Sequence, residues 1–259
     1  MSALHDSGFE YLAFDPPAAE DGARPDKLII LLHGYGRNAH YMEKMAESAR
    51  KAVPNARILS VHGQEPMTGK EIAGEGADHD LHMPKEMQAE MLQAEIDTDP
   101  TLRTHIRRQW FAIDGRAAAL LPRIERVSIR MNEFIDAQRD ALGLHDSDVV
   151  LMGFSQGAGL ALYTAFTRQQ ELGAMICHSS IMIQNPEEED PKLVSRPRVL
   201  YIYGEDDPEF PQQRFHDTFT WIQNYTGGRA VEKTVAGLGH YTNAKSRQFC
   251  ADFLHEVLS

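Results

Sequence analysis

The sequence contains little cysteine, no long hydrophobic run and no excess of positive charge. Its two cysteines, Cys177 and Cys250, have no CxxC spacing, so we expect buried thiols in a reducing compartment rather than a disulfide framework. No stretch approaches the ~20 apolar residues of a membrane span. The amino terminus has neither the basic start nor the apolar stretch of a secretory signal. These absences favour a cytoplasmic protein without a membrane span.

The charge balance disfavours a further class of partner. The chain has 26 Lys and Arg against 38 Asp and Glu, which gives a formal net charge of −12. This field repels phosphate backbones and anionic lipid, so nucleic acid is a poor candidate partner. The hydrophobic share of 42% is ordinary for a globular protein. At 259 residues we expect a single domain spanning residues 1–259, and a homodimer is left open.

Short, nearly continuous runs of Ile, Val and Leu recur along the chain, as in strands that are covered on both faces. They lie at residues 27–33, 56–61, 148–153, 174–180 and 198–204. Helical patterns lie between them, which predicts an α/β fold with a mostly parallel central sheet flanked by helices. Ligands bind such sheets at the carboxyl ends of the strands.

Two further strands are expected at the ends of the chain. Residues 8–15 alternate in polarity and predict an antiparallel edge strand. Residues 231–237 predict a late strand, followed by a final helix over 242–258.

The stretch at 62–109 does not follow this alternation. It begins glycine-rich and polar, and then places Met83, Met87 and Met91 on one side of a predicted helix. A long insertion near the strand ends favours a lid, with these methionines and Trp110 lining a substrate pocket. The alternative is a helix pair that packs its methionines into the nearest groove and has no other role.

A candidate nucleophile lies in residues 148–166, where an apolar strand gives way to glycines around one serine. Gly153, Ser155 and Gly157 fit the G-x-S-x-G pattern, and a run of helix formers follows. In this motif the serine occupies a strained strand-to-helix turn that exposes its hydroxyl. The alternative is an ordinary connection that the glycines merely shorten, but the flanking strand and helix favour the catalytic interpretation.

A serine hydroxyl needs a histidine to take its proton and a carboxylate to orient that histidine. In this order of elements the acid and then the histidine follow the serine. His216 and His255 fall on predicted helices, and His178 precedes the acid candidates. His240 lies in a glycine-flanked loop between a strand and a helix, so we assign it as the base.

The acid is expected directly after the strand at 198–204, where Glu205, Asp206 and Asp207 follow one another. The alternative for this segment is a solvated acidic turn. The oxyanion of the reaction needs backbone donors, which we assign to the N–H groups of Gln156 and Tyr35. His33 is expected to anchor the loop that carries Tyr35.

A metal site in the insertion is the main rival to this chemistry. The candidate ligands are Asp78, Asp80, His79, His82 and His105, but their spacing matches no zinc signature. We therefore expect neither a metal ion nor another cofactor.

Taken in order, LLHGYG, GFSQGAGLALYTA, GEDDPEFP and GLGHYTN resemble the phospholipase/carboxylesterase family of α/β hydrolases, which includes acyl-protein thioesterases. The likeness spans roughly residues 28–258 without most of the insertion. The family's D-P-x-x-P element is matched by Asp207, Pro208 and Pro211, which implies Asp207 rather than Asp206 as the acid. The family also uses the position of Tyr35 as an oxyanion donor. The chain departs from the pattern at 60–66 and 110–114, which flank the insertion.

The resemblance implies an α/β-hydrolase fold and a cofactor-free serine esterase. It would hydrolyse a small acyl ester or thioester through Ser155, His240 and Asp207 with an acyl-enzyme intermediate. A thioester, a lactone or a small amide could be cleaved at the same site. A different class of hypothesis is a ligand-binding protein that keeps the scaffold without turnover.

Overall fold

The computed structural model describes residues 2–4, 8–16, 24–67, 107–113, 117–183 and 190–259. Its main sheet has the strand order β1-β2-β4-β3-β7-β8-β9-β10. The bounds are β1 Ser2–Leu4, β2 Glu10–Phe14, β3 Lys27–Leu32, β4 Ala56–Val61, β7 Val149–Phe154, β8 Ala174–His178, β9 Arg198–Gly204 and β10 Ala230–Val235. From β4 to β10 in this order, neighbouring strands pair in parallel. Strand β2 pairs antiparallel with both β4 and β1.

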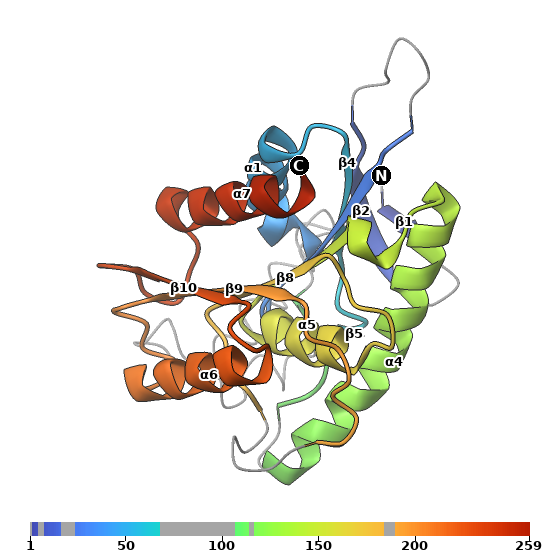
Figure 1. Ribbon diagram of the computed structural model, residues 1–259. Coiled ribbons are helices and arrows are strands. Elements are labelled where there is room, and N and C mark those ends of the chain that lie inside the picture. Colours follow the sequence, from blue (N-terminus) through green and yellow to red (C-terminus); the bar gives the residue numbers. More distant parts are fainter. Residues whose placement is uncertain (1, 5–7, 17–23, 68–106, 114–116, 184–189) are drawn as a thin grey trace, which may run out of the picture.

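Helices cover both faces of this sheet (Figure 1). Helices α1 (Glu43–Ala52) and α7 (Ala244–Leu258) lie together on one face. Helices α4 (Ala117–Leu142), α5 (Gln156–Thr167) and α6 (Gln212–Tyr225) lie on the other. Short 3-10 helices, η1 (Ala39–Met42) and η3 (Asp146–Asp148), precede α1 and β7. The predicted mostly parallel sheet with flanking helices is confirmed.

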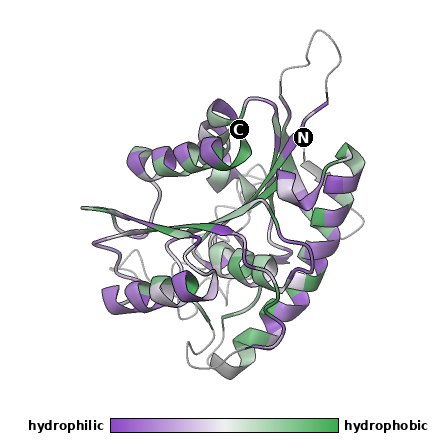
Figure 2. Ribbon diagram, viewed as in Figure 1, coloured by the Kyte–Doolittle hydropathy of each residue, from purple (hydrophilic) through white to green (hydrophobic). Residues whose placement is uncertain are grey.

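The two-sided covering explains the continuous apolar runs. In β3, Leu28, Ile30 and Leu32 belong to the core beneath α4, α5 and α6. Ile29 and Leu31 point to the opposite face and pack in the core beneath α1 and α7. Because successive side chains of a strand point to opposite faces, both sets must be apolar. Figure 2 shows the result, with hydrophobic strands at the centre and hydrophilic residues on the outer helix surfaces.

One strand prediction is wrong in detail. The stretch at 8–15 contains β2 and is antiparallel, as expected, but β1 pairs with it on the outside and takes the edge position. The three residues Ser2–Leu4 are too short to give a periodic signal of their own.

The parallel strands bring their carboxyl ends to one edge of the sheet. There the segments after β3, β7, β9 and β10 carry Tyr35, Ser155, Asp207 and His240. Two short strands, β5 (Glu65–Pro66) and β6 (Arg108–Gln109), pair antiparallel beside this edge. They bring together the two ends of the stretch at 62–109. Its predicted methionine helix lies outside the described residues.

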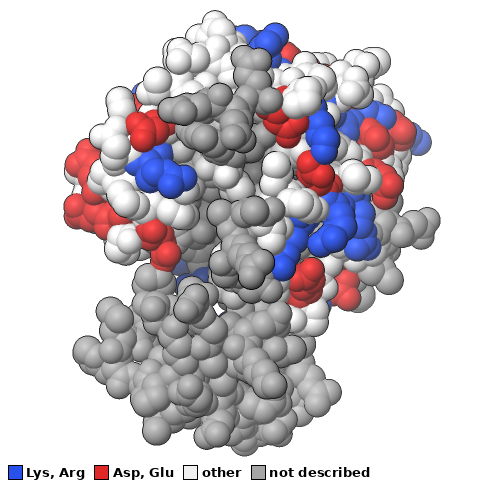
Figure 3. Space-filling model, turned by 90° about the horizontal axis from the view of Figure 1, so that it is seen from below, with Lys and Arg blue, Asp and Glu red and all other residues white. Residues whose placement is uncertain are grey.

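Acidic and basic side chains lie close together over the described part of the face shown in Figure 3. The described residues also pair opposite charges directly, as in the ion pairs of Lys192 with Glu125 and of Arg229 with Glu171. No helix within the described ranges combines the length and apolarity needed to cross a bilayer.

Candidate active site

Ser155 lies at the junction of β7 and α5 in a strained backbone conformation, with φ of 52°. Such positive values are uncommon outside glycine and are retained only where the surroundings impose them. The two motif glycines allow this turn because backbone atoms occupy the space of a side chain. A Cβ on Gly157 would lie 2.4 Å from the His33 carbonyl oxygen, and one on Gly153 would lie 2.3 Å from that of Gly157. The motif therefore lets β3, β7 and α5 approach closely.

The three residues selected from the sequence form one hydrogen-bonded chain. Ser155 Oγ lies 2.9 Å from His240 Nε2, and His240 Nδ1 lies 2.8 Å from one carboxylate oxygen of Asp207. Since the carboxylate can only accept, Nδ1 carries the proton and leaves Nε2 to accept from the serine hydroxyl. The Asp207 side chain is fully buried, and it also accepts a bond from the backbone N–H of Glu209.

The residues that the sequence set aside lie elsewhere. Asp206, next to Asp207, is exposed and makes no hydrogen bond with His240. His216 and His255 are exposed on α6 and α7. His178 is buried at the end of β8, where its ring lies tilted against Phe154 and its Nδ1 lies 3.1 Å from the hydroxyl of Ser179.

His33 anchors the loop that carries Tyr35. Its Nδ1 lies 2.8 Å from the Gly34 carbonyl oxygen, and its Nε2 accepts the N–H of Gly63 at 2.8 Å. Burial lowers the pKa of His33 to about 3, so the ring stays neutral at pH 7. Only a neutral ring can donate on one side and accept on the other, as both contacts require. The backbone segment at Gly34 and Tyr35 is thereby tied to the chain that enters the insertion.

The side chain of Gln156 has a role that the sequence analysis missed. Its carbonyl accepts the N–H of Trp110 at 3.0 Å, and its amide donates to the Phe111 carbonyl at 2.6 Å. The Trp110 indole N–H donates in turn to the His33 carbonyl at 2.7 Å. The glutamine after the serine thus fixes the chain where it returns from the insertion. The available signal was the glutamine of GFSQGA, of which the sequence analysis used only the backbone N–H.

The backbone N–H of Gln156 stands at the first position of α5, where a helix offers no acceptor of its own. Tyr35 and Gly34 face the same cavity as Ser155. Tyr35, Ser155 and Gln156 thus line one cavity, and the role of the two N–H groups as oxyanion donors stays a prediction. A charge developing there would also face the positive end of the α5 dipole.

A cavity of about 790 Å³ surrounds Ser155 and His240. Its apolar wall includes Phe111, Leu120 and the loop after β8, at Ile181 to Ile183. Trp110 does not line it. Because the Trp110 ring packs in the core and is 1% exposed, Phe111 and Ile113 provide the wall at this point.

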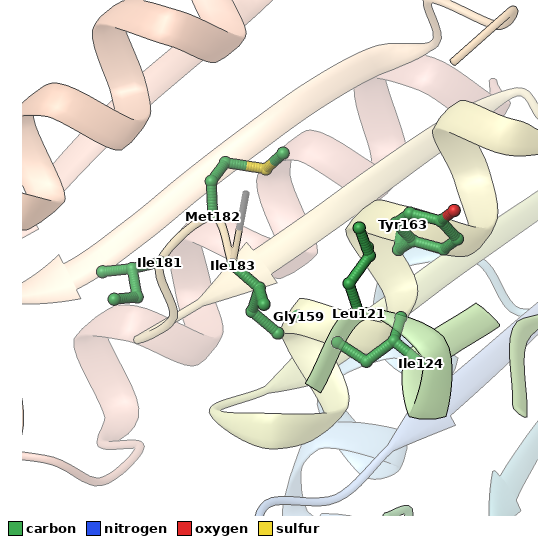
Figure 4. A pocket seen from close by; sticks show the side chains of 7 residues that line it. All are labelled: Leu121, Ile124, Gly159, Tyr163, Ile181, Met182 and Ile183. Atoms are coloured by element: carbon green, nitrogen blue, oxygen red, sulfur yellow. The ribbon is translucent and has the colours of Figure 1, made fainter. Parts of the chain in front are cut away.

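A smaller apolar recess of about 10 Å³ adjoins this wall, between α4, α5 and the loop after β8 (Figure 4). Gly159, Ile181, Met182 and Ile183 line both spaces, so the recess extends the cavity away from Ser155.

The sequence model of the phospholipase/carboxylesterase family matches residues 92–258, which is most of this chain. The chain belongs to the phospholipase/carboxylesterase family. The matched range includes Ser155, Asp207 and His240. It also includes part of the insertion and the return segment at Trp110, although the motif at Tyr35 lies before it.

Similar proteins agree with this family assignment. Acyl-protein thioesterase 1 of Kluyveromyces lactis is 28% identical over 132 residues, a match that spans 49% of this chain and 58% of that protein. The match thus covers little more than half of the curated relative. Among solved structures, esterase PE8 superimposes with a TM-score of 0.72 at 23% identity, over 95% of this chain and 98% of the esterase. The Bacillus cereus carboxylesterase superimposes with a TM-score of 0.66 at 15% identity, over 96% of this chain and 94% of the carboxylesterase. These likenesses establish the α/β-hydrolase fold.

Two predictions for this member of the phospholipase/carboxylesterase family cannot be compared with the structure. Met83, Met87 and Met91 lie outside the described residues, and so do the rejected metal ligands at 78–105. The methionine lining of the pocket therefore stays a prediction.

Proposed function

We propose that the protein is a serine hydrolase that cleaves carboxylic esters or thioesters of small acyl substrates. The observation that carries this proposal is the hydrogen-bonded chain from Ser155 through His240 to the buried carboxylate of Asp207. This arrangement supplies a nucleophile, a base and a group that orients the base. It opens onto a cavity large enough for a small ligand.

In the first half of the reaction, the Ser155 hydroxyl attacks the acyl carbonyl while His240 Nε2 takes its proton. Asp207 stabilises the imidazolium that forms and holds its Nδ1–H in place. His240 then donates the proton to the departing alcohol or thiol, which leaves an acyl group on Ser155. In the second half, His240 takes a proton from water, and the resulting attack releases the carboxylic acid and restores the serine.

Backbone donors stabilise the tetrahedral intermediate of each half. The N–H groups of Tyr35 and Gln156 are the proposed pair, since both residues face the cavity beside Ser155. His33 and Trp110 support them by holding the Tyr35 loop from behind.

The acyl group is proposed to lie along the apolar wall at Phe111, Leu120 and Ile181. This wall leads to the recess beside Gly159. Each methylene buried there contributes up to ~0.8 kcal/mol of binding, so kcat/KM rises with chain length until the wall is covered.

Two alternatives share parts of this site. A thioesterase, lactonase or small-amide hydrolase would use the same three residues with another leaving group. A ligand-binding protein without turnover would use the cavity alone. The intact Ser155–His240–Asp207 chain favours turnover, because a binding role does not require a serine aligned with a base.

The test is a panel of p-nitrophenyl esters and matched acyl thioesters of increasing chain length, applied to the wild type and to Ser155→Ala. The proposal expects hydrolysis by the wild type, with a rise from acetyl to medium chains, and loss of turnover in the variant. Turnover that survives Ser155→Ala would refute the assigned nucleophile. Binding of the esters without any hydrolysis would favour the ligand-binding alternative.

A further inference from the structure

The cavity around Ser155 has three sides that differ in chemistry. The side formed by α4, α5 and the loop after β8 is apolar, as described above. The side after β9 and in α6 carries both signs of charge, from Asp206, Glu209 and Arg214. The third side is formed by the segment after β3. Among the described residues that line this side, Arg37 carries the positive charge, and Tyr35 and Tyr41 line the same side.

The sheet order separates the two charged sides. Strands β3 and β8 flank β7 on opposite sides, and β9 lies beyond β8. The carboxylates of Asp206 and Glu209 therefore lie across the nucleophile from the segment that carries Arg37. Among the described residues, no carboxylate forms an ion pair with the Arg37 guanidinium, which is exposed.

A row of rings connects Arg37 to the base. The Arg37 guanidinium lies 5.1 Å from the centre of the Tyr41 ring, which is 5.6 Å from Phe154. Phe154 lies in turn 5.0 Å from His240. Burial raises the pKa of Tyr41 despite the nearby arginine, so this hydroxyl stays neutral and Arg37 supplies the charge on this side.

The contacts of Phe154 with His240 and with Tyr41 place this side of the cavity next to the leaving group. His240 donates its proton to the departing oxygen or sulfur, so the leaving group must lie next to the His240 ring. The acyl chain then extends toward the apolar wall. Resting on the proposed function, we propose that Arg37 binds an anionic group, a carboxylate or a phosphate, carried by the leaving alcohol or thiol of the substrate. A guanidinium suits both anions because its planar array of N–H donors matches their oxygens.

Two acetate esters with similar chromogenic leaving groups test this inference. One releases p-nitrophenol, and the other releases 5-hydroxy-2-nitrobenzoate, which adds a carboxylate to the same ring. We expect Arg37→Gln to raise KM for the anionic ester about five- to tenfold and to change KM for the neutral ester less than twofold. The kcat values should stay similar, because the contact is present in both the ground and transition states.

Two variants serve as controls. Arg37→Lys keeps the charge and should recover most of the lost affinity, and higher salt should weaken the preference of the wild type. Arg214→Gln removes the guanidinium on the β9 side. It should leave KM for both esters at the wild-type values. Arg37 substitution spares the backbone bonds with Gly34 and Arg108, since these do not involve the side chain.

Binding separates this inference from the proposed function. Benzoate and phenyl phosphate are titrated into Ser155→Ala with and without Arg37→Gln, which needs no turnover. If either anion binds more weakly without Arg37, the anion site is supported. The anion whose affinity falls shows whether the site prefers a carboxylate or a phosphate. Equal binding of both anions by the two proteins would overturn it, even if the neutral ester is hydrolysed normally. Failure of the wild type to hydrolyse any ester would instead refute the proposed function.

Discussion

The ends of β7 and β8 are neighbours in the sheet and carry nearly the same strained residue, but they differ in everything around it. Ser155 has φ of 52° and Ser179 has φ of 51°. Ser155 faces a cavity and lies 2.9 Å from His240. Ser179 is fully buried, and the ring within hydrogen-bond distance of its hydroxyl is that of His178, at 3.1 Å.

The histidines of the two strand ends differ in the same way. Both ring nitrogens of His240 have partners, and the ring is partly exposed. His178 is buried, no partner within the described part of the chain reaches its Nε2, and burial lowers its pKa to about 3. The comparison teaches that backbone strain alone does not indicate a nucleophile. Access to a ligand and a correctly placed carboxylate make the difference.

The largest expected effect separates the two serines. Ser155→Ala should lower ester turnover by ~10⁴-fold or more, because the serine, base and acid act as a unit. Ser179→Ala should lower it less than about fivefold, since its hydroxyl does not reach the cavity. Rates on p-nitrophenyl acetate measure both, and a fluorophosphonate probe should label Ser155 alone. Labelling of Ser179 would reverse the comparison.

The two adjacent aspartates provide the second contrast. Asp207→Asn should lower kcat by ~10³-fold or more, because an amide no longer holds the productive tautomer of His240. Asp206→Asn, one residue away and exposed, should change kcat less than about threefold. Steady-state kinetics of both variants on one ester give the ratio of their kcat values. If Asp206→Asn proved the more damaging change, the acid assignment would be wrong.

Loss of the loop anchor should have an intermediate effect. His33→Ala removes the contacts with Gly34 and Gly63 and should lower kcat by ~10²-fold through a misplaced Tyr35 donor. KM should change little, because the cavity walls remain. A matched His62→Ala variant removes a second buried histidine that contacts Ala39 rather than Gly34. Equal losses in both variants would indicate general destabilisation.

The smallest effect concerns stability and pH. His178 is held neutral by burial, which lowers its pKa in the folded protein to about 3 from the usual histidine value of 6.5. Between pH 3 and pH 6.5 the His178 ring is therefore protonated in the unfolded chain but not in the folded protein. The free energy of unfolding falls as the pH drops below 6.5. One such histidine should lower the free energy of unfolding by about 2 kcal/mol between pH 7 and pH 5.

Urea unfolding of the wild type and His178→Leu at both pH values tests this expectation. The variant should lose less stability on acidification, whatever its stability at pH 7. The same pH dependence in both proteins would mean that His178 does not titrate as its burial implies.

Much of this molecule follows from local patterns in the sequence. The apolar runs predicted β3, β4, β7, β8 and β9 because strands buried on both faces must be apolar throughout. The glycines around Ser155 predicted a tight turn, and the structure leaves no room for a side chain there: a Cβ on Gly153 would lie only 2.3 Å from the Gly157 carbonyl oxygen. The order of serine, acid and histidine selected residues that the fold brings into one hydrogen-bonded chain.

Only the tertiary structure determined which of these groups meet. The choice of Asp207 over Asp206 required a family pattern, since both follow the same strand and only the path of the loop turns one carboxylate toward His240. The hydrogen bonds of the Gln156 side chain join it to Trp110, 46 positions away, and to Phe111, 45 positions away. A local periodicity in the sequence cannot predict contacts over such separations. The charge of Arg37 is visible in the sequence, but its side of the cavity depends on β3 lying next to β7. The spacing of neighbouring residues specifies helices and strands because these form between residues close in the sequence. A site depends on the distances between residues that are far apart in the sequence, and only the tertiary structure sets these distances.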